Sequence, residues 1–267
     1  MPRLPPKTAD SRPTGVLVVN ADDWGMDRDT TERSFDCIRC RSVSAVSAMV
    51  FMKDSERAAA IARDHEVDAG LHLNFTTPFS AAGASLRLIA HQERLTWYLR
   101  SHRYAQVVPH PGLTSSFDYV VRSQFEEFAR LYGTAPNRID GHHHMHLCAN
   151  VVLRNLLPIG TIVRRNFSFQ AGEKWLGNRI YRQFIDGILR RRHQLVDYLF
   201  TLPPLEPIDR LHRIFDLARQ FLVEVEAHPV NPEEYRFLMG SAMAGRSERF
   251  PIAPRIAIAR CDRHIAA

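Results

Sequence analysis

The sequence predicts an α/β fold in which parallel strands alternate with helices and close into a (β/α) barrel. Short apolar runs alternate with amphipathic segments from residue 15 to residue 227, and polar residues cluster directly after several of the runs. Strands that alternate with helices build a mainly parallel sheet, and about seven such units in one domain favour a barrel over an open sheet. With 267 residues, 45% of them apolar, the chain can bury one large core.

Short apolar runs bounded by turn residues indicate strands buried on both faces. They occur at 15–20, 44–52, 67–75, 137–140, 161–165, 197–201 and 222–227. Apolar residues three or four positions apart indicate amphipathic helices. These occur at 29–39, 54–64, 117–132, 151–157, 178–194 and 208–220. Asp54 can cap the second helix, and Gly133 ends the third. The stretch 76–114, punctuated by Pro and Gly, is expected to be a loop region that carries some helix.

Residues 1–14 are Pro-rich and polar, and we expect a flexible tail ahead of a single domain over residues 15–267. No apolar run approaches the roughly 20 residues that span a bilayer. The start of the chain also lacks the apolar segment of a signal peptide. The sequence therefore predicts a cytoplasmic protein without a membrane span.

The net charge of +6 comes almost entirely from arginine. The arginines are scattered, and the dense run at 190–192 is expected to be a solvated helix face. They are not interleaved with aromatic residues, so a nucleic-acid partner is not expected. Cys37 and Cys40 have the CxxC spacing of zinc or redox sites, but they lie in a helical pattern without a second pair. Buried, reduced thiols are the favoured interpretation.

Histidines are concentrated in one short stretch: four of the seven residues from Asp140 to His146 are histidines. Neutral imidazole is the commonest protein ligand for transition metals. The stretch lies between a helical segment and an apolar run, so it is not an expression tag. It predicts a metal site directly after the fourth strand.

Three further polar clusters follow other predicted strands. Asp22 and Asp23 follow the first strand, His72 lies near the end of the third, and His228 follows the seventh. Each cluster alone has a structural alternative: a turn or helix cap for the aspartates, a buried core position for His72 and a loop position for His228. A parallel barrel brings the carboxyl ends of its strands to one rim, and this favours a shared site.

A site with one carboxylate and two or three imidazoles suits a divalent metal that keeps a position open for water. Such a metal acidifies its water and polarises a carbonyl oxygen, while a second carboxylate can act as a base. This set of groups fits hydrolysis of an amide or an ester. Neither a nucleophilic serine elbow nor a glycine-rich phosphate or dinucleotide loop is present in the sequence.

The polar clusters resemble those of the YdjC family of carbohydrate deacetylases, which includes the chitooligosaccharide and hopanoid-biosynthesis deacetylases. The matching segments are 20–25 (NADDWG), 70–73 (GLHL) with Thr76, 140–146 (DGHHHMH) and 228–229 (HP). They occur in the family's order between about residues 16 and 229. The resemblance implies an irregular (β/α) barrel related to polysaccharide deacetylases, and removal of an N-acetyl group from an amino sugar.

The resemblance also implies one divalent metal ion, Zn or Mg, bound by Asp23, His72 and His142. Mixed imidazole and carboxylate ligands favour zinc-like metals slightly. The expected partner is a small N-acetylated sugar, and a homodimer is one option for the assembly.

The catalytic groups follow by position in the same way. Asp22 corresponds to the general base that activates water, and His228 to the acid that protonates the departing amine. Arg164 resembles a family arginine that pairs with Asp22. The other histidines of the run, His143, His144 and His146, are expected to orient the ligands or to face the substrate.

Some positions depart from the family pattern. Trp24 stands where Phe is more usual, Gly141 stands where Ser is common, and the stretches 79–116 and 231–267 match poorly. Two rival functions stay open: a metal-dependent hydrolase of a phosphoester or a cyclic amide, and a metal-binding relative without catalytic activity.

Overall fold

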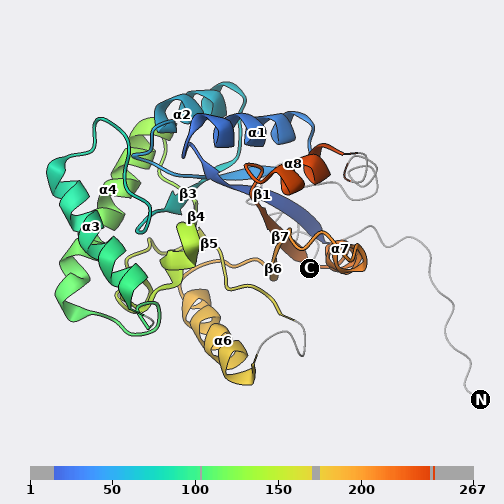
Figure 1. Cartoon of the computed structure of the whole chain (residues 1–267). Coiled ribbons are helices and arrows are strands. Elements are labelled where there is room, and N and C mark those ends of the chain that lie inside the picture. The colour runs from blue at the N-terminus through green and yellow to red at the C-terminus, as the bar shows by residue number, and fades with distance from the viewer. Residues whose placement is uncertain (1–14, 103, 170–174, 241–242, 244–267) are drawn as a thin grey trace, which may run out of the picture.

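The computed structural model describes residues 15–102, 104–169, 175–240 and 243. Across these residues, seven parallel strands form one sheet in the order β5-β4-β3-β2-β1-β7-β6 (Figure 1). The strands are β1 (Val16–Trp24), β2 (Ala45–Ala48), β3 (Ala69–Leu73), β4 (Arg138–Gly141), β5 (Ile162–Val163), β6 (Tyr198–Thr201) and β7 (Leu222–Ala227). Every predicted strand is therefore confirmed, although several are shorter than expected. The predicted tail at 1–14 lies outside the described residues.

Helices surround the sheet. They are α1 (Arg28–Arg39), α2 (Ser55–Asp64), α3 (Leu86–Ser101), α4 (Thr114–Tyr132), α5 (Ala149–Leu153), α6 (Leu176–Arg190), α7 (Asp209–Leu217) and α8 (Pro232–Met239), with short 3₁₀ helices η1 (Pro111–Leu113) and η2 (His142–Leu147). Gly133 ends α4 in the left-handed conformation, as its position predicts. The sequence did not indicate α8, which starts with Pro232 and is capped by the side chain of Asn231.

The sheet curls into an incomplete barrel, because its two edge strands do not pair along their length in the part of the chain that the structure describes. Short hydrogen-bonded contacts link the segments at the two edges instead. The N–H of Val163 donates to the carbonyl of Gln194 at 2.9 Å, and the N–H of Ser168 donates to the carbonyl of Leu199 at 2.8 Å. The predicted seven-stranded α/β barrel is thus confirmed in an irregular form.

The concave side of the curled sheet changes from apolar to polar along the strands. A small apolar cluster lies at one level, formed by Val18, Ala45, Ile162, Val196, Leu199 and Leu222. Because side chains alternate between the two faces of a strand, the next residues on this side are two positions further on. They are Asn20, Ser47, Arg164 and Glu224, which contact one another through hydrogen bonds. The larger apolar core lies between the sheet and the helices.

Three cysteines lie in the described part of the chain, and none forms a disulfide there. Cys37 and Cys148 are buried, as expected, but the prediction is wrong for Cys40, which is exposed. The reason is that α1 ends at Arg39, so Cys40 caps the helix instead of facing the core. None of the described helices is long and apolar enough to cross a membrane.

Candidate functional site

The predicted site residues come together at the carboxyl ends of five strands. Asp22 and Asp23 lie near the end of β1, and His72 lies on β3. His142 directly follows β4, Arg164 directly follows β5, and His228 directly follows β7. In parallel α/β folds this edge of the sheet is where functional groups gather.

A bulge in β1 gives both aspartates access to the same space. The pairing of β1 with β2 shifts register between Ala21 and Trp24, and Asp23 has a left-handed backbone with φ of 64°. Neighbouring residues of a regular strand would point to opposite faces, but a bulge redirects them. Both carboxylates approach His72 Nε2, Asp23 at 3.3 Å and Asp22 at 3.9 Å.

Asp23, His72 and His142 form a group that could hold a metal ion. His142 Nδ1 lies 2.8 Å and His72 Nε2 lies 3.3 Å from the same oxygen, Oδ1 of Asp23. Burial opposes ionisation of Asp23, but hydrogen bonds from His142 and His72 hold the pKa of its carboxyl well below the usual range. Two converging imidazoles and an ionised carboxylate fit an open divalent-metal site.

Asp140 holds the ring of His72. Its Oδ1 accepts a hydrogen bond from His72 Nδ1 at 2.7 Å, which leaves Nε2 directed at Asp23. Asp140 also accepts from the hydroxyl of Ser47 and lies 3.0 Å from the guanidinium of Arg164. A carboxylate that orients a histidine in this way is a recurrent feature of metal sites. The sequence analysis noted Asp140 only as an acidic neighbour of the histidine run.

Arg164 lies completely buried at the centre of an acidic cluster. It donates to both oxygens of Asp22 at 2.7 Å, so the pairing expected for these two residues is present. It also donates to Glu224 at 2.9 Å and to Glu226 at 3.1 Å. Burial raises the pKa of Glu224 above its ordinary value, whereas His144 and Arg164 outweigh burial and lower the pKa of Glu226 to about 2.

Glu224 and Glu226 were not recognised in the sequence as site residues. Both lie on β7, whose other residues are apolar, and both are buried. Two charged residues at alternate positions of an apolar strand are the signal that could have identified them, because such residues share one face.

His228 lies close to Asp22 and does not belong to the metal-type group. A ring nitrogen of His228 lies within 4.8 Å of carboxylate oxygens of both Asp22 and Glu226. Its backbone N–H donates to Glu234 at 2.8 Å, which anchors the loop after β7. Asp22 is therefore close both to His72 of the metal-type group, at 3.9 Å, and to His228.

The four histidines of the run point in different directions, because His143 and His144 both have left-handed backbones. His143 is exposed and hydrogen-bonds Thr76 at 2.9 Å. His144 lies 3.2 Å from Glu226, and its ring packs against that of Phe167. His146 is buried and donates to the backbone carbonyl of Arg164 at 2.9 Å. Among the four, His142 alone belongs to a metal-type group of the described residues.

A cleft of about 240 Å³ opens beside these histidines. His143, His144, Leu147 and Phe167 line it. Other lining residues come from the segment after α3, among them Val107, and from α6, among them Tyr181 and Ile185. The cleft thus offers a space next to the site with a partly apolar lining.

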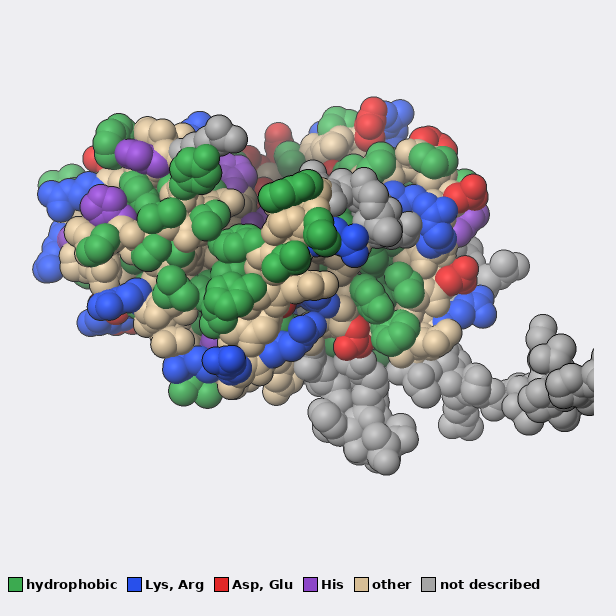
Figure 2. Space-filling view, turned by 90° about the horizontal axis from the view of Figure 1, so that it is seen from below, with side chains coloured by type: hydrophobic (Ala, Val, Ile, Leu, Met, Phe, Trp, Pro, Cys, Tyr) green, Lys and Arg blue, Asp and Glu red, His purple; other side chains and the backbone are tan. Residues whose placement is uncertain are grey.

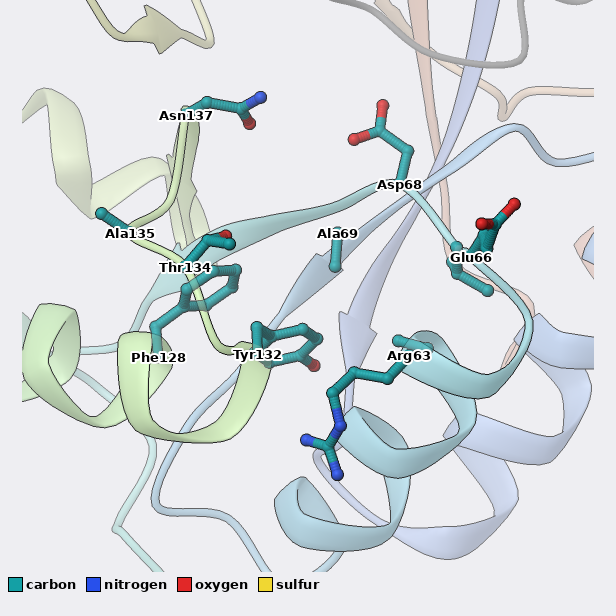
Figure 3. Close-up of a pocket in the computed structure, with 11 residues that line it drawn as sticks. Arg63, Glu66, Asp68, Ala69, Phe128, Tyr132, Thr134, Ala135 and Asn137 are labelled. Atoms are coloured by element: carbon teal, nitrogen blue, oxygen red, sulfur yellow. The ribbon is translucent and has the colours of Figure 1, made fainter.

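A second cavity, of about 390 Å³, lies at the opposite end of the strands. Figure 3 shows its lining, which includes Arg63, Glu66, Asp68 and Tyr132. It contains no histidine or cysteine and lies at the amino end of β3, where parallel folds seldom carry chemistry. We therefore assign the functional site to the histidine cluster.

Comparison with known proteins agrees with this geometry. A family profile described as YdjC-like protein matches residues 16–245. A chitooligosaccharide deacetylase of Serratia marcescens is 28% identical over 136 residues, which are 49% of this chain and 51% of that protein. A carbohydrate deacetylase of Homo sapiens is 30% identical over 143 residues, 53% of this chain and 44% of that protein. The chain spans about half the length of these curated relatives.

A solved structure has a similar fold. It is that of a proposed cellobiose-phosphate cleavage protein from Enterococcus faecalis V583, with a TM-score of 0.60 and 15% sequence identity. The similarity covers 88% of this chain and 94% of that one. The family profile extends over β1 to β7 and all of the site residues described above. The chain therefore belongs to the YdjC-like protein family.

Proposed function

We propose that this protein is a metal-dependent hydrolase that removes an N-acetyl group from an amino sugar or an N-acetylated glycoconjugate. The observation that carries the proposal is that Asp22 lies close to two sets of groups. One is the metal-type group Asp23, His72 and His142, whose His72 Nε2 lies 3.9 Å from Asp22, and the other contains His228. The names of the relatives, chitooligosaccharide and carbohydrate deacetylase, agree with this chemistry.

A divalent ion bound by Asp23, His72 and His142 would acidify a bound water and polarise the acetyl carbonyl. Two imidazole ligands favour zinc over magnesium.

Asp22 is the proposed base, and its Oδ2 is the oxygen that can accept the proton. Its Oδ1 accepts hydrogen bonds from both Arg164 and Asn20, which use its two lone pairs. Its Oδ2 accepts one bond, from Arg164, and lies 3.9 Å from His72 Nε2. The remaining lone pair of Oδ2 is therefore available for the proton of a water beside the metal-type group.

His228 is the proposed acid. A protonated imidazole at this place can pass its proton to the sugar nitrogen as the C–N bond breaks and acetate leaves. Arg164 holds Asp22 in position through two parallel hydrogen bonds, an arrangement that fixes orientation as well as charge. The sugar would enter through the cleft beside His143 and His144.

Parallel assays of acetate release from N-acetylglucosamine monomers and oligomers and of phosphate release from sugar phosphates, with metal analysis on the same sample, test the proposal. We expect acetate release that a chelator abolishes and added zinc or magnesium restores, with about one metal ion per chain. One ion is expected because the positive charge of Arg164 already lies against the carboxylates of Asp22 and Glu226. A second cation beside these carboxylates would have to displace Arg164. Two ions per chain with phosphate release would favour the phosphoester hydrolase. Metal binding without release of acetate or phosphate would favour a non-catalytic relative.

A further inference from the structure

Helix α6 carries a stripe of large apolar side chains that the described residues leave uncovered. Leu176, Ile180 and Phe184 are 64%, 55% and 62% exposed, and Trp175, directly before the helix, is 81% exposed. Residues four positions apart lie on the same side of a helix, so these side chains form one continuous ridge. Several neighbouring large apolar residues exposed together mark an interaction surface. We call these four residues the α6 stripe.

The exposed side of α6 is basic at one end and carries no acid. Arg190 and Arg191, at the carboxyl end of α6, are both exposed. The acidic residue of the helix, Asp186, is buried and paired with Arg165. An apolar ridge with arginines beside it complements a surface that is apolar inside and negatively charged at its rim.

A second group of exposed apolar residues lies in a segment that lines the cleft together with α6. The segment between α3 and η1 contains Tyr104, Val107 and Val108, all about half exposed or more. Val107 lines the same cleft as Tyr181 and Ile185 of α6, so both segments contribute to its lining. In Figure 1 both segments lie on the lower side of the molecule, and Figure 2, viewed from below, shows abundant hydrophobic side chains there.

We propose that the α6 stripe docks on the surface of an anionic lipid bilayer. The apolar side chains would enter the boundary between headgroups and acyl chains, and Arg190 and Arg191 would contact lipid phosphates. Helices with Trp, Phe and Leu on one side and arginines beside them lie in the plane of a membrane interface, where tryptophan is enriched. This mode needs no helix that spans the membrane.

The shape of the surface favours a bilayer over a second copy of the chain. Figure 1 shows α6 projecting from the sheet as a single convex helix. A fluid bilayer adapts to such a ridge, whereas another folded chain would have to present a matching groove. The docking surface is independent of the proposed deacetylase activity.

Vesicle flotation tests the proposal with the full chain. Vesicles of phosphatidylcholine alone are compared with vesicles in which a quarter of the lipid is phosphatidylglycerol, at low ionic strength. We expect the chain to float with the anionic vesicles. The triple variant Leu176→Gln, Ile180→Gln and Phe184→Gln should bind them about tenfold or more weakly. The variant Arg190→Gln with Arg191→Gln should lose most of the preference for anionic over neutral lipid.

The control is Leu86→Gln with Met239→Gln, which removes exposed apolar side chains from α3 and α8. It should float like the unchanged chain, and circular dichroism verifies that every variant is folded. The proposal is overturned if the unchanged chain stays in the soluble fraction, or if the triple variant floats as well as the control. A dimer that the triple variant converts to monomers, without vesicle binding, would assign the α6 stripe to a second copy instead.

Discussion

The guanidinium of Arg164 donates one hydrogen bond to each carboxylate oxygen of Asp22, at 2.7 Å in both cases. The two residues are 142 positions apart in the sequence and are both buried. The same guanidinium lies within 3.1 Å of Asp140, Glu224 and Glu226. One arginine therefore neutralises much of the negative charge that the curled sheet encloses, and it holds the proposed base.

Replacing Arg164 with methionine should destabilise the fold strongly. A buried ion pair that loses one partner leaves an uncompensated charge, which costs about 3–5 kcal/mol of unfolding free energy. Urea denaturation measures the loss. Arg165→Met is the matched control, because Arg165 pairs with Asp186, which keeps two hydrogen bonds from Asn166. The control should lose clearly less, and equal losses would contradict the central role given to Arg164.

Asp22→Asn and His142→Ala should separate the base from the ligand. Asp22→Asn removes the proposed base but leaves the metal-type group Asp23, His72 and His142 intact. The metal content should therefore persist, while kcat falls about 100-fold or more. His142→Ala removes an imidazole that faces Asp23, so metal content itself should drop. Metal analysis beside acetate release gives both readouts. If Asp22→Asn strips the metal, the two aspartates have exchanged roles.

Much of the site could be predicted from the sequence, because its groups follow strands and the carboxyl ends of parallel strands share one edge. That argument placed Asp23, His72 and His142 at the same rim without any knowledge of strand order. The barrel class followed from the alternation of strands and helices, which is a local property of the chain. Strand ends were less accurate: β5 has two residues, whereas five were expected, because the pairing partner decides where a strand stops.

The buried acidic cluster could not be predicted in this way. Glu224 and Glu226 face Arg164 because the sheet curls: Arg164 follows the edge strand β5, which stands five places from β7 in the strand order. No local pattern in the sequence reveals this contact. Asp140 and Ser47 meet for the same reason, since their side chains share the concave side of the sheet. Helix α3 was expected only as some helix in a loop region, because its apolar residues follow the helical period weakly.

Asp140→Asn should weaken metal binding about 10–100-fold. An amide offers one oxygen and one NH₂, but His72 donates to one side of Asp140 while Ser47 and Arg164 approach the other. One of these donors would then face the NH₂ group, and His72 would lose its orientation. Titration of zinc against a chromophoric chelator measures the change. Asp186→Asn, a buried aspartate outside the site, should leave zinc affinity intact, so an equal effect in both variants would contradict the argument.

The described cysteines should differ sharply in reactivity. Burial raises the pKa of the Cys37 and Cys148 thiols to about 12, whereas Cys40 is exposed. Because the thiolate is the nucleophile, iodoacetamide at about pH 8 should label Cys40 in the folded chain and spare the other two. Mass spectrometry of the peptides, with urea-unfolded protein as the reference, checks this. Rapid labelling of Cys148 in the folded chain would contradict its burial.

His146→Gln should make stability less sensitive to acid. Burial lowers the pKa of His146 to about 3 from an ordinary value of 6.5, so the unfolded chain binds more protons between these two pH values. Stability is fully present above about pH 6.5 and falls as pH decreases toward about 3. His146 alone contributes a slope of at most about 1.4 kcal/mol per pH unit in that window.

Glutamine does not titrate, and its amide can still donate to the carbonyl of Arg164, which accepts from His146 at 2.9 Å. Unfolding free energies from urea titrations between about pH 4 and pH 7 should therefore decline less steeply for His146→Gln than for the unchanged chain. His212→Gln, at an exposed position on α7, is the control and should follow the unchanged chain. Parallel curves for all three proteins would show that His146 is not buried as a neutral imidazole. A steeper decline for His146→Gln would show that the histidine stabilises the fold in its charged form.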